Sequence, residues 1–142
     1  MQTCSGHVGL VAEGLRTLAE SLSEEYAQGY PFPHIVIDNF LSEEILDQVV
    51  DEFPGNTDDA WHRFSEDTSI KISCNDRDVL GFQTSLLIDQ LNAPTMLDFL
   101  SRLTGIKDLI PDAHLFGGGL HQIPPGGFLK IHADFNKHPT WH

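Results

Sequence analysis

The sequence predicts an α+β domain in which helices come first and a β-region begins late in the chain. Before Gly105, apolar residues recur at helical spacing. After Gly105, glycine- and proline-rich turns separate short runs of β-forming residues. The length of 142 residues matches one domain, and 40% hydrophobic residues suffice for a core. We therefore expect a single domain with helices packed on a β-sandwich, helical over about 1–105 and β-rich over about 106–142.

The first predicted helix has an apolar face with the 4-3-4 spacing that places side chains on one side of a helix. The members of this face are Val11, Leu15, Leu18 and Leu22. Gly29 and Pro31 end the helix because neither residue favours its continuation. The next segment, residues 33–40, is apolar and rich in β-forming residues, so we expect a buried strand there.

The second predicted helix begins after Ser42, whose side chain is a good N-cap. Glu43 and Glu44 follow and complement the positive end of the helix dipole. Its buried face is predicted to consist of Ile45, Leu46, Val49, Val50 and Phe53. Pro54 and Gly55 then end the helix.

A polar stretch at residues 56–69 predicts a long loop, with Trp61 and Phe64 as its hydrophobic anchors. Residues 70–73 predict a short strand. Two further helices follow, and their apolar faces contain Leu86, Leu87 and Leu91 in one and Met96, Leu97, Leu100 and Leu103 in the other. We expect Asn92 to cap the second of these, and Gly105 to end it.

The β-region is predicted from two runs of β-forming residues joined by a turn. Residues 115–123 predict a strand interrupted by a glycine-rich kink or bulge. Pro124–Gly127 predicts a turn, and residues 128–135 predict the following strand. The two strands therefore form a hairpin.

The charge balance limits the classes of partner. The chain has 8 Lys+Arg against 21 Asp+Glu, a formal net charge of −13. Such a field repels phosphates, so we expect no nucleic-acid partner. The sequence has no signal peptide pattern and no apolar run long enough for a membrane span, and its two cysteines, Cys4 and Cys74, do not suggest a disulfide framework. We expect a soluble, cytoplasmic protein without a membrane partner.

His132 and Asp134 form the pattern with the clearest chemical meaning. On a strand, side chains two positions apart point to the same face, so an imidazole and a carboxylate converge there. Together they can bind adjacent positions of one metal ion, as in the two-His-one-carboxylate sites of non-haem iron oxygenases. An unpaired carboxylate in a largely apolar strand would be costly, and a metal would offset that cost. The alternative is an ordinary pair of polar contacts at a strand end.

Two longer runs make a family resemblance visible. Residues 33–53 (PHIVIDNFLSEEILDQVVDEF) resemble the entry strand and helix of 2-oxoglutarate- and Fe(II)-dependent oxygenases. Residues 115–136 (LFGGGLHQIPPGGFLKIHADFN) resemble the metal-binding hairpin of the prolyl 4-hydroxylase-like branch of that superfamily. The resemblance implies a double-stranded β-helix, or jelly roll, with His132 and Asp134 as the first two iron ligands.

The resemblance also implies a reaction. Members of this superfamily are dioxygenases that use O2 and the co-substrate 2-oxoglutarate to hydroxylate an unactivated C–H bond. Many members of the prolyl hydroxylase-like branch act on proline in a peptide or protein and use L-ascorbate to keep the iron reduced. The distal histidine and the basic residue that holds 2-oxoglutarate would follow residue 142, so we expect 1–142 to be a partial oxygenase domain with an incomplete jelly roll and little or no activity. Leu129 occupies the position of a tyrosine that binds the co-substrate in many relatives.

Alternatives to this metal site remain open. His121, on the neighbouring predicted strand, is a packed histidine or a further ligand of a cupin-like metal site. His138 and His142 are interpreted as exposed tail residues, and His114 as a turn residue. Lys130 shares the face of His132 and Asp134 and could compensate Asp134 without a metal. In that case the protein is a non-catalytic β-sandwich module for binding or assembly.

The predicted loop around Trp61 and His62 admits two interpretations as well. Long loops often form lids over binding sites, so these residues could line a substrate entrance. The plainer interpretation is that Trp61 is a hydrophobic anchor of the loop.

Overall fold

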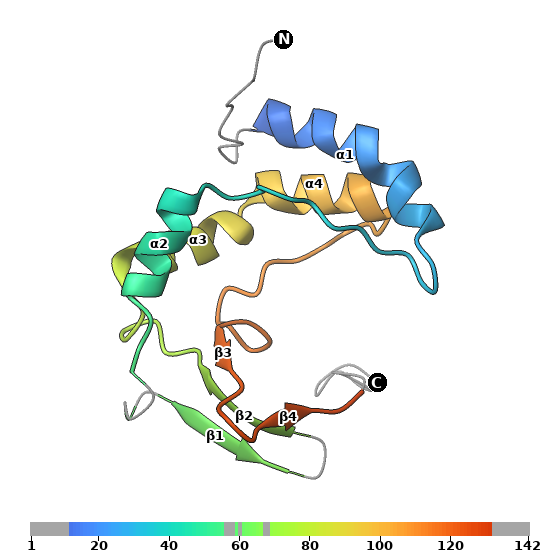
Figure 1. Cartoon of the computed structure of the whole chain (residues 1–142). Helices are drawn as coiled ribbons and strands as arrows, with labels where there is room; N and C mark the ends of the chain where they lie inside the picture. The colour runs from blue at the N-terminus through green and yellow to red at the C-terminus, as the bar shows by residue number, and fades with distance from the viewer. Residues whose placement is uncertain (1–11, 56–58, 60, 67–68, 132–142) are drawn as a thin grey trace.

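The computed structural model describes residues 12–55, 59, 61–66 and 69–131 and shows an α+β chain (Figure 1). The helices are α1 (Ala12–Gln28), α2 (Glu43–Asp51), α3 (Phe82–Leu91) and α4 (Pro94–Thr104). The strands are β1 (His62–Ser65), β2 (Ser69–Cys74), β3 (Leu120–Gln122) and β4 (Phe128–Leu129). The predicted α+β class is confirmed. The short strand predicted over 70–73 is confirmed as β2. The predicted order is wrong in part, because β1 also lies between α2 and α3.

The described strands form one small antiparallel sheet with β2 at its centre (Figure 1). β1 pairs along one edge of β2, with His62 opposite Ser73. β3 and β4 share the other edge, because β3 pairs with Ile72–Cys74 and β4 with Ser69 and Ile70. β2 therefore brings together chain segments from the middle and the end of the described residues.

The prediction of a loop over 56–69 is wrong where β1 lies. β1 forms a hairpin with β2, and reciprocal backbone hydrogen bonds between Glu66 and Ser69, of 2.9 and 3.2 Å, close it. All four residues of β1 are exposed. A strand with so little burial has no apolar alternation, so its sequence resembles that of a loop; pairing with β2 decides its conformation.

Two hydrophobic cores stabilise the described part of the chain. The first lies between α1 and α4, and consists of Leu15, Ala19, Met96, Phe99 and Leu103. The second lies where one face of the sheet meets the segments around α3, and consists of Trp61, Ile72, Cys74, Leu80 and Leu115. Figure 1 shows α1 and α4 side by side at one end of the molecule and the sheet at the other.

The strand predicted at residues 33–40 is not present. This segment has no ladder partner among the described residues, and it packs as an irregular segment against the first core. Ile35, Ile37 and Phe40 contact that core, whereas Val36 is 79% exposed. The alternation suits a strand, but a strand needs a neighbour for its backbone groups, and here the neighbours are helices.

The predicted start of α2 is confirmed, and its predicted buried face is wrong in part. Ser42 is the N-cap, and its Oγ accepts a hydrogen bond from the Ile45 backbone N–H at 3.4 Å. No residue of α2 is buried, and Leu46 and Val50 are 42% and 68% exposed. Glu52, the C-cap residue of α2, connects this helix to α3 because its side chain accepts hydrogen bonds from the backbone N–H groups of Gln83 and Thr84.

The two later helices confirm the predicted elements but not the predicted cap. Ala93 is the N-cap of α4, while Asn92 is the C-cap of α3. The Asn92 side chain accepts a hydrogen bond from the Asp112 backbone N–H at 2.7 Å, so it connects the end of α3 to the loop before β3. Gly105 ends α4 in the left-handed conformation (φ 74°), as predicted.

The hairpin predicted for the β-region is wrong, because β3 and β4 each pair with β2 and not with each other. β3 covers Leu120–Gln122, so most of the glycine-rich run before it is a loop rather than a kinked strand. The turn predicted at 124–127 is confirmed: the Gly127 N–H donates to the Pro124 carbonyl at 2.8 Å, and Gly126 has φ 82°. The far part of the strand predicted over 128–135 lies outside the described residues.

Candidate functional site

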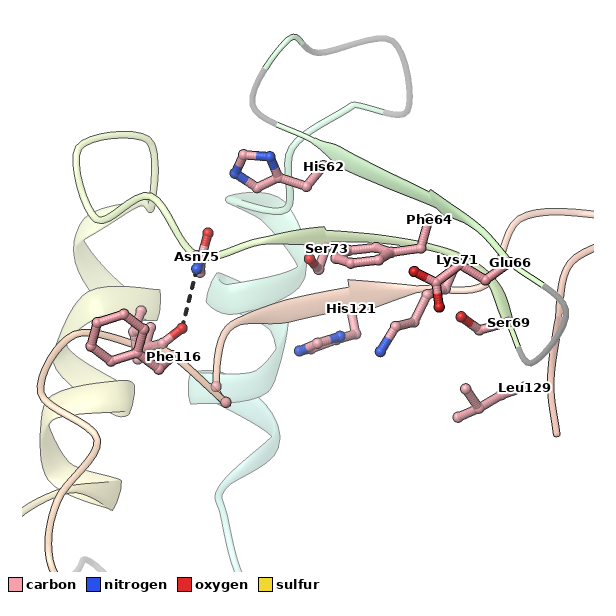
Figure 2. Close-up of a pocket in the computed structure, with 13 residues that line it drawn as sticks. His62, Phe64, Glu66, Ser69, Lys71, Ser73, Asn75, Phe116, His121 and Leu129 are labelled. Carbon is pink, nitrogen blue, oxygen red and sulfur yellow. Dashed lines mark hydrogen bonds between the residues drawn. The ribbon is translucent and has the colours of Figure 1, made fainter. Parts of the chain in front are cut away.

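A hollow of about 660 Å³ lies on the sheet face opposite the second core (Figure 2). Side chains from all four strands line it, together with the loop at residues 115–118. Polar members include His62, Glu66, Ser69, Lys71, Ser73, Asn75 and His121. Because strand side chains alternate between faces, the residues of β2 between these positions point to the core instead.

A row of three polar side chains crosses the sheet at one end of the hollow. The register places His62 of β1 and His121 of β3 on either side of Ser73. Ser73 is 8% exposed, although its neighbours at both ends of the row are exposed. A buried serine between two imidazoles gives this end of the hollow three side chains that can form hydrogen bonds.

Lys71 supplies positive charge to the hollow. It lies opposite Phe64 in the β1–β2 register, and its Nζ lies 5.5 Å from the centroid of the Phe64 ring. This contact is a cation–π interaction, which orients the ammonium without neutralising it. Figure 2 shows the Lys71 and His121 side chains on the same side of the sheet.

The pKa of His121 is lowered by burial and by the charge of Lys71. Partial burial of the imidazole lowers its pKa from the ordinary value of 6.5, because burial disfavours the charged form. The Lys71 ammonium lowers the pKa further, because it repels a second positive charge. His121 is therefore mainly neutral at pH 7, so one ring nitrogen donates a hydrogen bond and the other accepts one.

The Asp112 carboxylate determines the shape of the loop that lines the remaining side of the hollow. It accepts hydrogen bonds from the backbone N–H groups of Phe116, Gly117 and Gly118 at 2.9, 2.8 and 2.9 Å. Burial raises the pKa of Asp112, but the three hydrogen bonds outweigh that effect and its pKa is lowered from 3.8. The Asn75 amide holds the other end of this loop by donating to the Leu115 carbonyl at 3.2 Å (Figure 2).

The predicted metal ligands His132 and Asp134 lie outside the described residues, as do His138 and His142. β4 ends at Leu129, which lines the hollow. The Lys130 Nζ lies 5.4 Å from the centroid of the Phe128 ring. β4 thus ends beside the hollow, three positions before His132 in the sequence.

The other candidates lie within the described region. Trp61 is 6% exposed, and its Nε1 donates to the Gly55 carbonyl at 2.8 Å, so its interpretation as an anchor is confirmed. Phe64 is not an anchor, because it is 36% exposed on the hollow side. His62 lines the hollow, and His114 lies exposed in the loop before β3 with its ring 5.9 Å from that of Phe116.

The described residues include no group of three or more His, Cys, Asp or Glu side chains that could hold a metal ion. Over the same residues, no helix combines the length and apolarity needed to cross a membrane. Comparison of this chain with protein-family models, with curated proteins and with solved structures found no match.

Sequence interpretation overlooked Lys71 and Ser73. The signal is visible in β2, where Ser69, Lys71 and Ser73 alternate with Ile70, Ile72 and Cys74. This period of two predicts one polar and one apolar face. What the alternation could not show is that β1, β3 and β4 would add their own polar side chains to the same face.

Proposed function

We propose that this protein belongs to the 2-oxoglutarate- and Fe(II)-dependent oxygenases, in their prolyl 4-hydroxylase-like branch. In this proposal the sheet is part of a jelly roll, His132 and Asp134 are iron ligands, and the whole protein hydroxylates a C–H bond on a prolyl or other peptide side chain. The iron, when bound, supplies the chemistry of O2 activation, with 2-oxoglutarate as co-substrate and ascorbate as reductant. The residues 115–136, with their resemblance to the metal-binding hairpin, are the main support.

The observation in the structure that supports the proposal most is the place of β4. Leu129, three positions before His132, lines a hollow that also contains His121 and Lys71. A reaction centre near this point would have a concave, partly polar surface beside it, as ligand sites commonly do. The described residues do not themselves supply a metal site, so we derive no step through the iron.

The chain's own side chains can perform three tasks in this proposal. Lys71 and the hydroxyls of Ser69 and Ser73 can orient a polar ligand over the sheet. His121, held neutral by its lowered pKa, can donate or accept a hydrogen bond there. Phe64 and Leu129 line the hollow and, as apolar side chains, can exclude water from part of it.

Anaerobic addition of Fe(II) and 2-oxoglutarate tests the proposal. A visible charge-transfer band should appear, and it should be lost in both His132→Ala and Asp134→Ala because each removes one of the two predicted ligands. His114→Ala is the matched control, since this exposed histidine lies in the loop before β3, and it should keep the band.

Two other outcomes would contradict the proposal. A folded chain that gives no band lacks the predicted iron and co-substrate site, and the non-catalytic binding module would then be the better interpretation. A band lost equally in His121→Ala and His132→Ala would indicate a cupin-like site that uses the histidine of β3.

A further inference from the structure

Within the described part of the chain, Lys71 differs from three arginines that form ion pairs. Arg16, Arg77 and Arg102 each contact an Asp or Glu carboxylate within 4.0 Å. No such pair joins Lys71 to a carboxylate among the described residues, although Glu66 lines the same hollow. In a chain with a net charge of −13, a lysine on a concave surface without a carboxylate partner leaves its charge available to an anion.

Side chains that can donate hydrogen bonds lie on the same face of the sheet as Lys71. Ser69 and Ser73 precede and follow Lys71 by two positions on β2, so all three side chains lie on the same face. Both serines are buried, at 6% and 8% exposure. Figure 2 shows both hydroxyls and the His121 ring on the side of the sheet where Lys71 lies. Hydroxyl groups and a neutral imidazole can each donate to an oxygen atom beside the ammonium.

Apolar side chains line other parts of the same hollow. Phe64, Leu129 and Phe116 are 36%, 48% and 87% exposed, and each contributes to its lining. Exposed large apolar side chains gathered around a concave polar centre are typical of a site for a ligand with both a polar and an apolar part.

We propose that this hollow binds a small carboxylate with an apolar body, the carboxylate against Lys71 and the body against Phe64, which lies opposite Lys71, and Leu129, which lies opposite Ser69. One ammonium matches the single charge of a carboxylate. A phosphate dianion is disfavoured because the lowered pKa of His121 leaves Lys71 as the main positive charge inside an acidic chain. This inference goes beyond the proposed function, since it needs neither iron nor the residues that would bind it.

Isothermal titration calorimetry at pH 7 in EDTA, on the full chain, tests the inference with phenylacetate as the probe. Phenylacetamide keeps the apolar body and removes the charge, while acetate keeps the charge and removes the body. We expect phenylacetate to bind at least about ten-fold more tightly than either, because a charged hydrogen bond and a buried ring are each worth at least that factor. Inorganic phosphate should bind more weakly than phenylacetate.

Variants locate the site. Lys71→Met keeps the length of the side chain and removes its charge, so the dissociation constant of phenylacetate should rise at least about ten-fold. Lys71→Arg should keep the affinity within a few-fold. Lys107→Met is the matched control, because Lys107 is an exposed lysine in the segment after α4, and it should leave the affinity unchanged. Leu129→Ala, at a position that is 48% exposed, should weaken the binding of phenylacetate and leave the fold intact.

The inference is overturned if phenylacetate shows no binding at millimolar concentration, if phenylacetamide binds equally well, or if phosphate binds more tightly. Equal affinity in the wild type and in Lys71→Met would also overturn it. If Lys71→Met does not fold, the binding of the three probes to the wild type and to the Leu129→Ala variant still decides between these outcomes. Because no iron is present, failure here is separate from failure of the oxygenase proposal.

Discussion

At the scale of single residues, two carboxylates each accept hydrogen bonds from several donors of a neighbouring segment. Asp112 accepts three backbone hydrogen bonds in the loop beside the hollow. Glu52 accepts hydrogen bonds from the backbone N–H groups of Gln83 and Thr84. These groups lie in the first turn of α3, where backbone N–H groups have no acceptor within the helix. Gly81, the N-cap of α3, has no side chain for this purpose, so a carboxylate from the preceding helix replaces it.

Replacing Asp112 by Asn should lower the free energy of unfolding at pH 7 by about 1–2 kcal/mol, because an amide oxygen is a weaker acceptor than a carboxylate for three N–H groups. Urea unfolding measures the effect. Asp108→Asn is the control, since this exposed carboxylate lies in the preceding segment, and it should be nearly neutral. A wild-type free energy of unfolding in Asp112→Asn would contradict the role assigned to the carboxylate.

The contribution of Asp112 should depend on pH with a defined sign. Its pKa is lowered in the folded chain, so the stabilisation is fully present above the ordinary carboxyl pKa of the unfolded chain and is lost as pH falls through the lower folded value. The difference in unfolding free energy between wild type and Asp112→Asn should therefore shrink between pH 5 and pH 3. A difference that stays constant over this range would show that the three hydrogen bonds do not favour the ionised form.

Gly81→Ala should destabilise the protein by about 1–3 kcal/mol, because the new Cβ would overlap the Glu52 carboxylate and disturb the cap of α3. Thermal unfolding measures the loss. The test of mechanism is a double-mutant cycle, since in the Glu52→Ala background the overlap is absent and Gly81→Ala should cost much less. Additive effects of the two substitutions would contradict this contact.

At the scale of elements, neighbours decide which segments become strands. β1 has an exposed, polar sequence and is a strand because β2 pairs with it, whereas the apolar segment 33–40 has no strand partner and packs on α1 and α4. β3 depends on close approach of its backbone to β2. A Cβ at Gly119 would lie 2.6 Å from the Cys74 carbonyl oxygen, and this glycine has φ 132°.

Gly119→Ala should therefore destabilise the fold by at least about 1–2 kcal/mol, since both the left-handed backbone and the contact with β2 exclude a side chain. Gly14→Ala is the matched control. Gly14 lies in α1 with open space around it, so this substitution should stabilise by about 0.5–1 kcal/mol. Chemical denaturation of both variants distinguishes the two cases, and equal effects would mean that β3 tolerates a looser approach to β2.

At the scale of the whole molecule, the two cores share no residue. The α1–α4 core and the core beneath the sheet are connected through α3, which contacts both α2 and α4 (Figure 1). The hollow lies on the sheet, so its geometry depends chiefly on the second core and on the loop around Asp112.

Phe99→Ala should therefore destabilise the α1–α4 end of the molecule more than the sheet. Phe99 is 2% exposed in the first core, and its truncation should cost about 3–5 kcal/mol of local stability. Amide hydrogen exchange should accelerate more in α1 and α4 than in β2. Equal acceleration across the chain would instead show that both cores unfold as one cooperative unit.

The sequence by itself predicted the α+β class, the four helices with most of their ends, the Ser42 cap and the turn at Pro124–Gly127. These features depend on neighbours within a few residues, such as a cap, a turn or a helical face. The jelly roll and the iron ligands His132 and Asp134 remain predictions from the sequence, as the pair lies outside the described residues.

Only the tertiary structure decided that the segment before α2 is not a strand, that β1 is one, and that His62, Lys71, Ser73 and His121 face the same hollow. The physical reason is pairing. A strand satisfies its backbone groups only with a partner distant in the sequence, and the register of β2 with that partner determines which side chains share a face.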